Sequence, residues 1–222
     1  MKTNLYFLIT AAAIILSALT ACSNNKTESE VASALPLMVI DQSEFQNDYM
    51  KKCVHTSQCQ APLVCMNKTC IIPPSILGKT DENTPKLFYQ NAEDRQFIYI
   101  EIVSDDYTTQ RGMMMRRACH PEWGMLFVFP SEAKHAFWMH NTYIPLDMVF
   151  IRVDGSVSNI HENAEALNDI PRYPSTDKVK YVLELPAGSV QKHQISLSTK
   201  FDVSQFHVSS EDFRSNHIFN SH

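Results

Sequence analysis

The chain has 222 residues, 44% of them hydrophobic, and a formal net charge of −5 at pH 7. This length predicts one ordinary domain with appendages, since most domains contain about 100–150 residues. The charge is mild and mixed, without a basic patch, which argues against nucleic acid as a partner.

The first 21 residues have the features of a secretory signal. Lys2 precedes an almost uncharged apolar run at 5–19, which is too short to be read first as a membrane-spanning helix. The run ends in the letters LTAC at 19–22, which resemble the lipobox of bacterial lipoproteins. That resemblance implies cleavage before Cys22 and a lipid on its sulfur. The alternative is an ordinary signal peptide in which Cys22 is coincidental.

A lipid on Cys22 would make the membrane a partner and place the protein in the bacterial cell envelope. Ser23 rather than aspartate follows the cysteine. By resemblance to the usual sorting rule, this favours the outer membrane of a cell with two membranes, facing the periplasm or the cell surface. Residues 22–50 are polar and irregular and are predicted to form a flexible tether.

Residues 51–72 are predicted to form a small segment held together by disulfides. An exported chain oxidises its thiols, and so short a segment cannot bury a useful core. Three pairings are possible among its four cysteines. A zinc site of four thiolates is the alternative, although the paired C-x2-C knuckles of zinc ribbons are absent. The cysteines are Cys53, Cys59, Cys65 and Cys70.

The spacing of these cysteines resembles short cysteine-rich repeats of secreted proteins. That resemblance favours the pairs Cys53–Cys65 and Cys59–Cys70.

A linker punctuated by proline and glycine is predicted at 73–92, a main domain at 93–204 and a polar tail at 205–222. Residues 108–109 are expected to begin a helix with Asp105 or Asp106 as its cap. A second short helix is expected at 187–195, and Asp154-Gly155 predicts a tight hairpin turn. Strands are expected at 97–103, 125–129, 136–140, 146–153, 156–163, 181–186 and 200–203.

These elements predict a mostly β domain of the α+β class. We expect a compact antiparallel sheet or barrel-like domain with one or two short helices, preceded by the disulfide-stapled segment.

Four long motifs then occur in order along this domain. They are RGMMMRR at 111–117, GMLFVF at 124–129, FWMHNTYIPLDMVFI at 137–151 and YVLELPAG at 181–188. Together they resemble the domain of unknown function 192 (DUF192) family over roughly residues 95–203. The resemblance implies a compact β-rich domain and no established activity. His140 departs from the family, which usually has lysine there.

Three charged residues lie in or beside apolar elements and are candidates for a site: Arg111, Asp147 and Glu184. Carboxylates are seldom buried unless they are paired. We therefore expect Arg111 to bridge one or both carboxylates and to pin the helix to the sheet. The alternative makes the carboxylates the general acid and base of a hydrolase, for which no nucleophile is evident.

A second candidate group is Trp138, His140 and Asn141, which interrupt an apolar stretch. An aromatic ring beside amide and hydroxyl groups could bind a sugar or another small planar ligand. The alternative is a core tryptophan whose N–H finds a carbonyl. Strand alternation would place Trp138 and His140 on one face, with Phe137, Met139 and Asn141 on the other.

The remaining sulfur and imidazole groups favour packing over chemistry. Cys119 is the odd thiol, which we interpret as a buried substitute for leucine, with a reactive thiol as the alternative. The methionines of the domain could bind Cu(I) with a histidine, but packing is the simpler interpretation. No histidine spacing is typical of a zinc enzyme, so we expect no metal and no cofactor.

The sequence thus predicts a membrane-anchored envelope or surface lipoprotein that binds a small molecule, a glycan or a protein partner without catalysis. One alternative is an envelope hydrolase acting on carbohydrate or cell-wall material. Another is an interaction protein that uses its cysteine-rich segment.

Overall fold

The structure, a computed structural model, describes residues 50–91 and 94–214. Contacts divide the chain into two units, residues 1–40 and 41–222, and all described residues belong to the second. The predicted signal, the lipid acceptor Cys22 and the tether up to residue 49 lie outside the described residues. Where the chain is described, no helix has both the length and the apolar character needed to cross a membrane.

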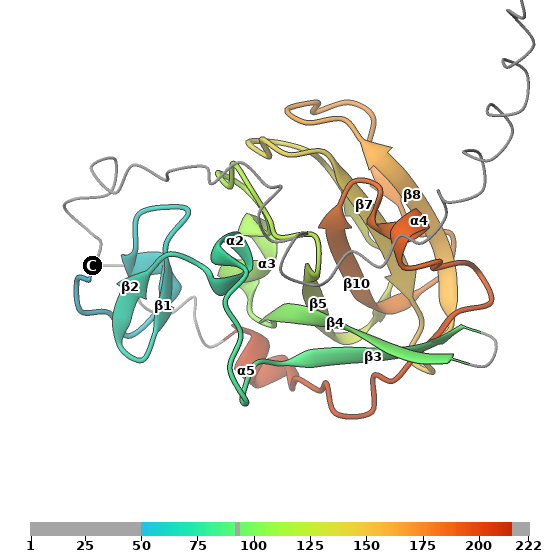
Figure 1. The fold of residues 1–222 in the computed structure, drawn as a ribbon, viewed down its shortest axis with the longest axis horizontal. Coiled ribbons are helices and arrows are strands. Elements are labelled where there is room, and N and C mark those ends of the chain that lie inside the picture. Colours follow the sequence, from blue (N-terminus) through green and yellow to red (C-terminus); the bar gives the residue numbers. More distant parts are fainter. Residues whose placement is uncertain (1–49, 92–93, 215–222) are drawn as a thin grey trace, which may run out of the picture. The chain divides into compact units, whose positions relative to one another are not determined.

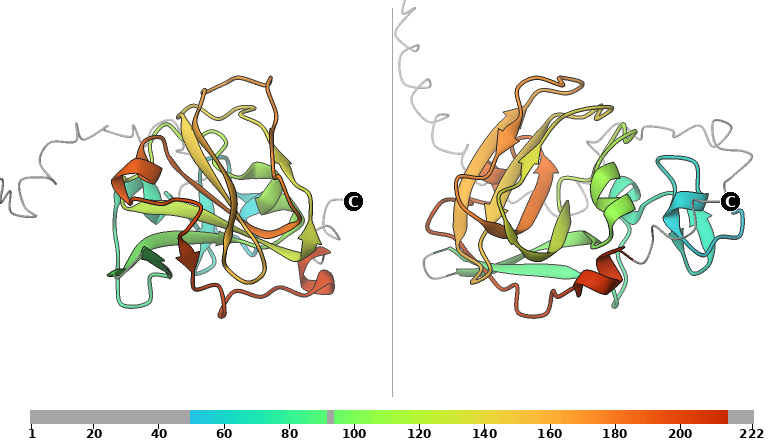
Figure 2. Two further views of the ribbon diagram at one scale, coloured as in Figure 1. Left: turned by 90° about the vertical axis from the view of Figure 1, so that its right-hand side faces the viewer. Right: turned by 180° about the vertical axis from the view of Figure 1, so that it is seen from behind.

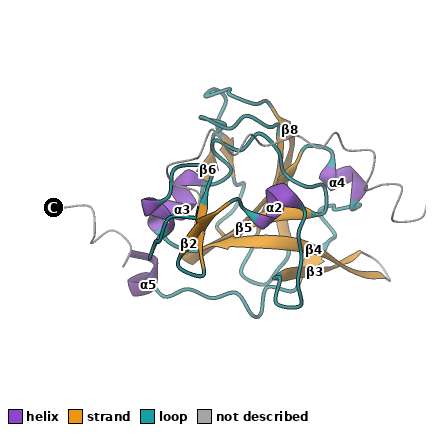
Figure 3. Cartoon of the chain, turned by 60° about the vertical axis from the view of Figure 1, so that its left-hand side comes forward, coloured by secondary structure: helices purple, strands orange, loops and turns teal. Residues whose placement is uncertain are grey.

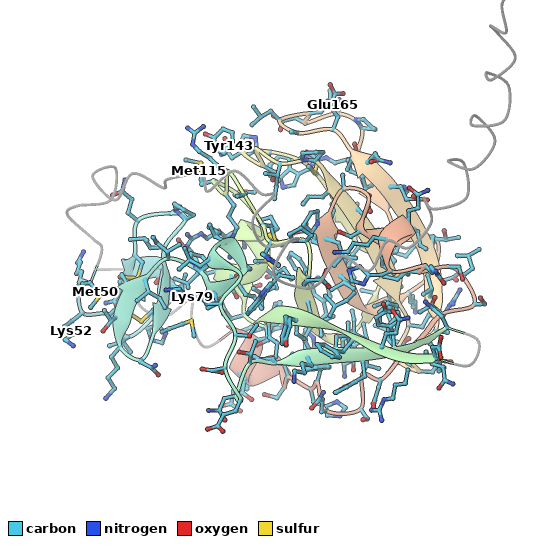
Figure 4. The ribbon with its side chains drawn as sticks, viewed as in Figure 1. Met50, Lys52, Lys79, Met115, Tyr143 and Glu165 are labelled. Atoms are coloured by element: carbon cyan, nitrogen blue, oxygen red, sulfur yellow. A yellow bond between two sulfur atoms is a disulfide. The ribbon has the colours of Figure 1, made fainter. Side chains whose placement is uncertain are left out.

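The cysteine-rich segment forms a small hairpin with two disulfides (Figures 1 and 4). A 3-10 helix, η2 (Thr56–Gln58), precedes the antiparallel strands β1 (Val64–Met66) and β2 (Thr69–Ile71). The disulfides join Cys53 to Cys65 and Cys59 to Cys70, which confirms the predicted pairing. Because all four sulfurs are in disulfides, they are not available as the thiolates of a zinc site.

The range predicted as a linker, 73–92, contains a helical turn and a strand. These are α2 (Pro74–Leu77) and β3 (Lys86–Asn91). Leu87 and Tyr89 alternate along β3 and are buried. β3 pairs with β4 (Asp94–Val103), so the boundary predicted at residue 93 falls inside a hairpin.

Seven strands form one sheet in the described part of the chain, in the order β11-β3-β4-β5-β10-β7-β8. Neighbouring strands are antiparallel except for β4 and β5, which are parallel. The five strands not yet given are β5 (Trp123–Ala133), β7 (Leu146–Ile151), β8 (Val157–Ala164), β10 (Val179–Pro186) and β11 (Lys200–Phe201).

The sheet curls until its two edges meet (Figure 2). Ser156 forms a bridge with Lys200, and the Phe201 N–H donates to the Gly155 carbonyl at 2.9 Å. Gly155 has φ 85°, as expected for the predicted hairpin, and a Cβ there would lie 2.1 Å from the Phe201 carbonyl oxygen. Glycine is therefore required at this closing contact. The mostly β, barrel-like fold class is confirmed.

The two faces of the central strands pack into two separate cores. Val149, Leu183 and Leu185 lie in one core, whereas Met148 and Val182 lie in the other. This division follows from strand geometry, since successive side chains point to opposite faces. The position of Asp147 along β7 and of Glu184 along β10 therefore decides which of the two cores each carboxyl enters.

Short helices accompany the sheet (Figure 3). α3 (Asp106–Arg111) is capped by Asp105, whose side chain accepts a hydrogen bond from the Thr108 N–H at 2.9 Å. This confirms one of the two predicted caps, and the helix begins two residues earlier than expected. α4 (Ser189–Lys192) lies within the second predicted helix.

Two regions predicted as irregular contain packed elements. The loop at 163–176 contributes β9 (Tyr173–Pro174), which pairs with β6 (Ala136–Phe137). The predicted polar tail contributes α5 (Ser210–Arg214) and the buried Phe206, whose carbonyl accepts a hydrogen bond from the Tyr181 hydroxyl at 2.9 Å. Phe206 in the core and Phe213, whose ring centroid lies 6.2 Å from that of Phe129, thus anchor a segment whose composition alone looks solvent-exposed.

Candidate functional site

A pocket of about 600 Å³ lies among α3, the turn that follows it, β5 and β6. Its wall is mainly aromatic rings and thioethers. These come from Met113, Met114, Met115, Phe127, Phe129, Phe137 and Trp138. Such a wall suits an apolar or aromatic ligand body.

The turn after α3 shapes one side of the pocket. Gly112 has φ 47°, and a Cβ there would lie 3.1 Å from the Phe127 ring. The chain then buries Met113 and leaves Met115 partly exposed. The N–H of Met115, labelled in Figure 4, donates to the Asn141 carbonyl at 2.8 Å, which joins this turn to the loop after β6.

Three buried side-chain polar atoms lack a hydrogen-bond partner within the described residues. They are Nη1 of Arg111, Nε2 of His135 and Oε2 of Glu184, and all three residues line this pocket. A buried polar atom without a partner costs about 1–3 kcal/mol. Their gathering at one cavity is what distinguishes this place from the rest of the interior.

Glu184 lies on the pocket-facing side of β10 and is only 4% exposed. Its Oε2 atom lies 3.4 Å from where a Cβ of Gly112 would be. Burial raises the pKa of this carboxyl to about 8, although Arg116 and a hydrogen bond from the Met113 backbone act in the opposite direction. Glu184 is therefore mainly a neutral acid at pH 7, able to donate as well as accept a hydrogen bond.

Arg111 ends α3 and does not make the carboxylate bridge that the sequence predicted. Its Nη2 donates to the Leu63 carbonyl at 2.9 Å, and its Nη1 has no partner. Burial lowers the pKa of the guanidinium, and the Tyr107 hydroxyl partly offsets this. The predicted bridge from Arg111 to Asp147 or Glu184 is wrong.

The buried ion pair of this region is made by Arg116 instead. Its guanidinium donates to both oxygens of Glu101, at 2.7 and 2.8 Å, and to the Ser75 hydroxyl at 2.8 Å. Burial alone would raise the pKa of Glu101, but Arg116 and Ser75 hold it below its usual range. The turn after α3 separates the two arginines, so that Arg116 and not Arg111 reaches a carboxylate on β4.

His135 also lines the pocket, although it is not among the predicted ligand-binding residues. Its ring stacks on Phe129, with centroids 3.7 Å apart and planes 17° apart. Burial lowers its pKa, so the ring is neutral at pH 7. Nothing in the local sequence around His135 predicts that this histidine lines a pocket.

Asp147 lies on the opposite face of the sheet from Glu184. The register pairs Asp147 with Leu185 and Met148 with Glu184, so the two carboxyls point to different cores. The oxygens of Asp147 accept hydrogen bonds from the Asn163 and Val190 N–H groups, each at 2.9 Å. Asp147 therefore ties β7 to β8 and α4, and it does not converge with Glu184 as a hydrolase pair would require.

Trp138 lines the pocket and is 38% exposed, but other groups already lie against its ring. His140 stacks on it with centroids 4.7 Å apart, and the Arg172 guanidinium lies 4.1 Å from its centroid. His140 also contacts Asp169 at 3.0 Å. The ring is thus only partly available as an open platform for a sugar.

Strand alternation holds for Trp138 to His140 and then ends. Asn141 has φ 51° and is exposed, whereas alternation would have placed it beside the buried Met139. The expected strand at 136–140 shortens to two residues. Of the six predicted ligand-binding residues, Arg111, Trp138 and Glu184 line the pocket.

Cys119 is not disulfide-bonded and packs against the core that faces the pocket. Its thiol donates a weak hydrogen bond to the Trp123 carbonyl at 3.7 Å. Burial raises its pKa to about 12. These features fit the interpretation of Cys119 as a buried apolar side chain. Cys119 is half-buried, whereas Met139 and Met148 are fully buried.

The family model of DUF192, described as Uncharacterized ACR, matches residues 88–203, just over half of the chain. One similar solved structure is a protein from Sinorhizobium meliloti 1021 that carries the provisional name of transcription regulator. It is 34% identical with a TM-score of 0.51, and the match covers 55% of this chain and 97% of that one.

Another similar structure is a protein of unknown function from Novosphingobium aromaticivorans DSM 12444. It is 27% identical with a TM-score of 0.51, and the match covers 54% of this chain and 84% of that one. No curated protein matches the chain.

Proposed function

We propose that this chain, which belongs to the DUF192 family, binds a small molecule in the pocket between α3, β5 and β6 without transforming it. The observation that carries the proposal is that Arg111, His135 and Glu184 each leave a buried polar atom unpartnered at this one pocket. Elsewhere in the described interior, buried side-chain polar atoms have partners. A ligand with matching polar groups would remove the cost of leaving these three unpaired.

The dimensions and chemistry of the pocket support a small molecule. Its volume of about 600 Å³ lies within the range of roughly 300–1,000 Å³ found for ligand pockets. An apolar wall with a few polar groups is the usual composition of such sites. A glycan resting on Trp138 is less favoured, because His140 and Arg172 already lie against that ring.

Binding is favoured over hydrolysis because the two carboxyls on which the hydrolase hypothesis depended lie on opposite faces of the sheet. Asp147 is closed off by two backbone N–H groups. Glu184 faces the pocket without a second carboxylate among the residues that line it. General acid and base catalysis by this pair has no geometric support.

The pocket can be tested by filling it without touching its polar groups. Ala136 lines the pocket and is exposed, whereas Ala133 lies three residues earlier on β5 and does not line it. Nile red, an uncharged fluorescent dye, should bind the purified chain and bind Ala136→Trp at least tenfold more weakly. Ala133→Trp should retain the dye. Equal dye affinity in both variants, with native circular dichroism, would contradict the proposal.

The proposed setting of this binding module is the bacterial cell envelope, with the lipid on Cys22 as anchor. The support is the lipobox-like LTAC at 19–22. Metabolic labelling with palmitate in a bacterial host should label the full chain and not Cys22→Ala, and only the former should sediment with membranes. Label on both forms would contradict the anchor and leave the pocket proposal unaffected.

A further inference from the structure

We propose that the pocket selects a small organic monoanion, a carboxylate on an apolar body, and that Arg111 is the cation that pairs with it. The inference rests on the proposed function, that the pocket binds a small molecule, and it names the class of ligand. It is carried by the charges around the pocket and by the geometry of Arg111.

The charges of the buried groups around the pocket do not cancel. Arg116 is paired with Glu101, so these two together contribute no net charge. Glu184 is mainly neutral at pH 7, since burial raises its pKa to about 8. The Cys119 thiol is neutral too, with its pKa raised to about 12, and the pKa of His135 is lowered. What remains is one positive charge, on Arg111.

Arg111 has no carboxylate partner among the described residues. The ion pairs of the described residues involve other cations, and its nearest polar contacts are the Leu63 carbonyl and the Tyr107 hydroxyl. A buried charge without a counter-ion is costly, and its own pKa is lowered by burial. An anionic ligand would supply the missing counter-ion.

The orientation of Arg111 also suits this role. Its Nη2 is held by the Leu63 carbonyl, which restricts the guanidinium, while Nη1 stays without a partner at the pocket. A carboxylate oxygen at Nη1 would make a charge-assisted hydrogen bond, which is about twice as strong as a neutral one. Because Nη1 is itself buried, a small shift of the pocket wall must expose it to the ligand.

The rest of the pocket selects the body of the ligand. Phe127, Phe129, Phe137 and the methionines of 113–115 form an apolar wall that would bury rings or alkyl chains. The neutral acid of Glu184 and the neutral imidazole of His135 could donate to or accept from a further carbonyl or hydroxyl on the ligand. A cationic ligand would place a second positive charge beside Arg111.

Three compounds of equal shape and different charge test the selection. They are 3-phenylpropionate, 3-phenylpropionamide and 3-phenylpropylamine, titrated into the purified full chain by calorimetry at pH 6.5. The acid should bind at least tenfold more tightly than the amide, and the amine should show no binding. Equal affinities for acid and amide, or a preference for the amine, would overturn the inference.

Variants assign the preference to Arg111. Arg111→Gln should bind acid and amide equally, and Arg111→Lys should keep part of the preference because it keeps the charge. Arg117 is the matched control, since it is exposed, stacks on Tyr143 and does not line the pocket. Arg117→Gln should keep the full preference. If it loses the preference as Arg111→Gln does, a general surface charge is responsible and Arg111 is not the determinant.

The pH dependence provides an independent arm. Glu184 lines the pocket together with Arg111 and His135, and its carboxyl interacts with Arg116 and Cys119. When Glu184 ionises, its negative charge cancels the excess positive charge. Affinity for 3-phenylpropionate should therefore fall as pH rises from 7 to 9 in the wild type and stay level in Glu184→Gln. A fall of the same size in both would contradict this charge balance.

The failures of the two proposals are distinguishable. If none of the three compounds binds while Nile red still binds and is blocked by Ala136→Trp, the anion inference fails and the small-molecule pocket stands. If Nile red binding is also insensitive to Ala136→Trp, the proposed function fails with it.

Discussion

The neighbouring strands β7 and β10 each carry one buried carboxyl, and the two carboxyls differ in their hydrogen bonding. Asp147 on β7 is 0% exposed and accepts two backbone hydrogen bonds. Glu184 on β10 is 4% exposed, faces the pocket and keeps one oxygen without a partner. Burial is the same for both, so hydrogen bonding is what separates a structural carboxyl from a candidate functional one.

The two arginines of the same region repeat the contrast. Arg116 is almost fully buried and is bound by Glu101 and Ser75, whereas Arg111 keeps Nη1 free at the pocket. The satisfied groups hold the sheet and its turns together. The unsatisfied groups line the pocket and should contribute less to folding, which the following substitutions can test.

The largest expected difference is between the two arginines. Arg116→Met should lower the free energy of unfolding by about 4 kcal/mol, because it leaves Glu101 as a buried charge without its partner. Arg111→Met should lower it by only about 1 kcal/mol, the typical value of one hydrogen bond. Urea unfolding of the two variants at pH 7 measures both. Equal losses would remove the distinction between a structural and a ligand-binding arginine.

The next effect concerns Asp147. Asp147→Asn should lower the free energy of unfolding by about 3 kcal/mol, because a neutral amide can accept only one of the two backbone hydrogen bonds with its oxygen and loses the charge assistance. Urea denaturation followed by circular dichroism is the measurement. A loss below about 1 kcal/mol would show that the hydrogen bonds of Asp147 contribute little to joining β7, β8 and α4.

The unpaired carboxyl of Glu184 should make the stability of the chain depend on pH. Its folded pKa of about 8 exceeds the unfolded value, so the folded chain holds a proton that the unfolded chain releases. Stability from this group is then present below pH 4.5 and is lost as pH rises toward 8. Between pH 5 and 7 the loss should be about 2 kcal/mol.

Glu184→Gln should remove this dependence. Other groups, including His135 and His193, also titrate, so the informative quantity is the difference between wild type and variant at each pH. Thermal unfolding from pH 5 to 8 should show Glu184→Gln gaining stability relative to wild type as pH rises. A constant difference across this range would mean that Glu184 is ionised in the folded chain.

The smallest expected effect is at Cys119, whose thiol has hydrogen-bond partners. Cys119→Ala should lower the free energy of unfolding by less than about 1.5 kcal/mol, since it removes one sulfur atom and the thiol hydrogen bond is weak. The native thiol, with its pKa raised to about 12, should react with iodoacetamide far more slowly at pH 7.5 than in the urea-unfolded chain. Rapid labelling of the folded chain would reveal a reactive thiol.

Much of the fold could be predicted from local sequence patterns. Alternation located the central strands, Asp105 was one of two expected helix caps, and Asp154-Gly155 predicted the turn that the structure contains. The cysteine pairs followed from a resemblance and are confirmed. Strand β3 and the burial of Phe206 were not predicted, because a short apolar alternation among polar residues is a weak signal.

The candidate site was only half predictable. Composition and period-two alternation are local properties, so the sequence alone shows which residues carry charge within apolar elements. The folded structure places Asp147 and Glu184 in opposite cores, pairs Arg116 with Glu101, and leaves Arg111 without a carboxylate partner among the described residues. These outcomes depend on strand register and on a turn at Gly112, which bring together residues far apart in the chain and leave no trace in local periodicity.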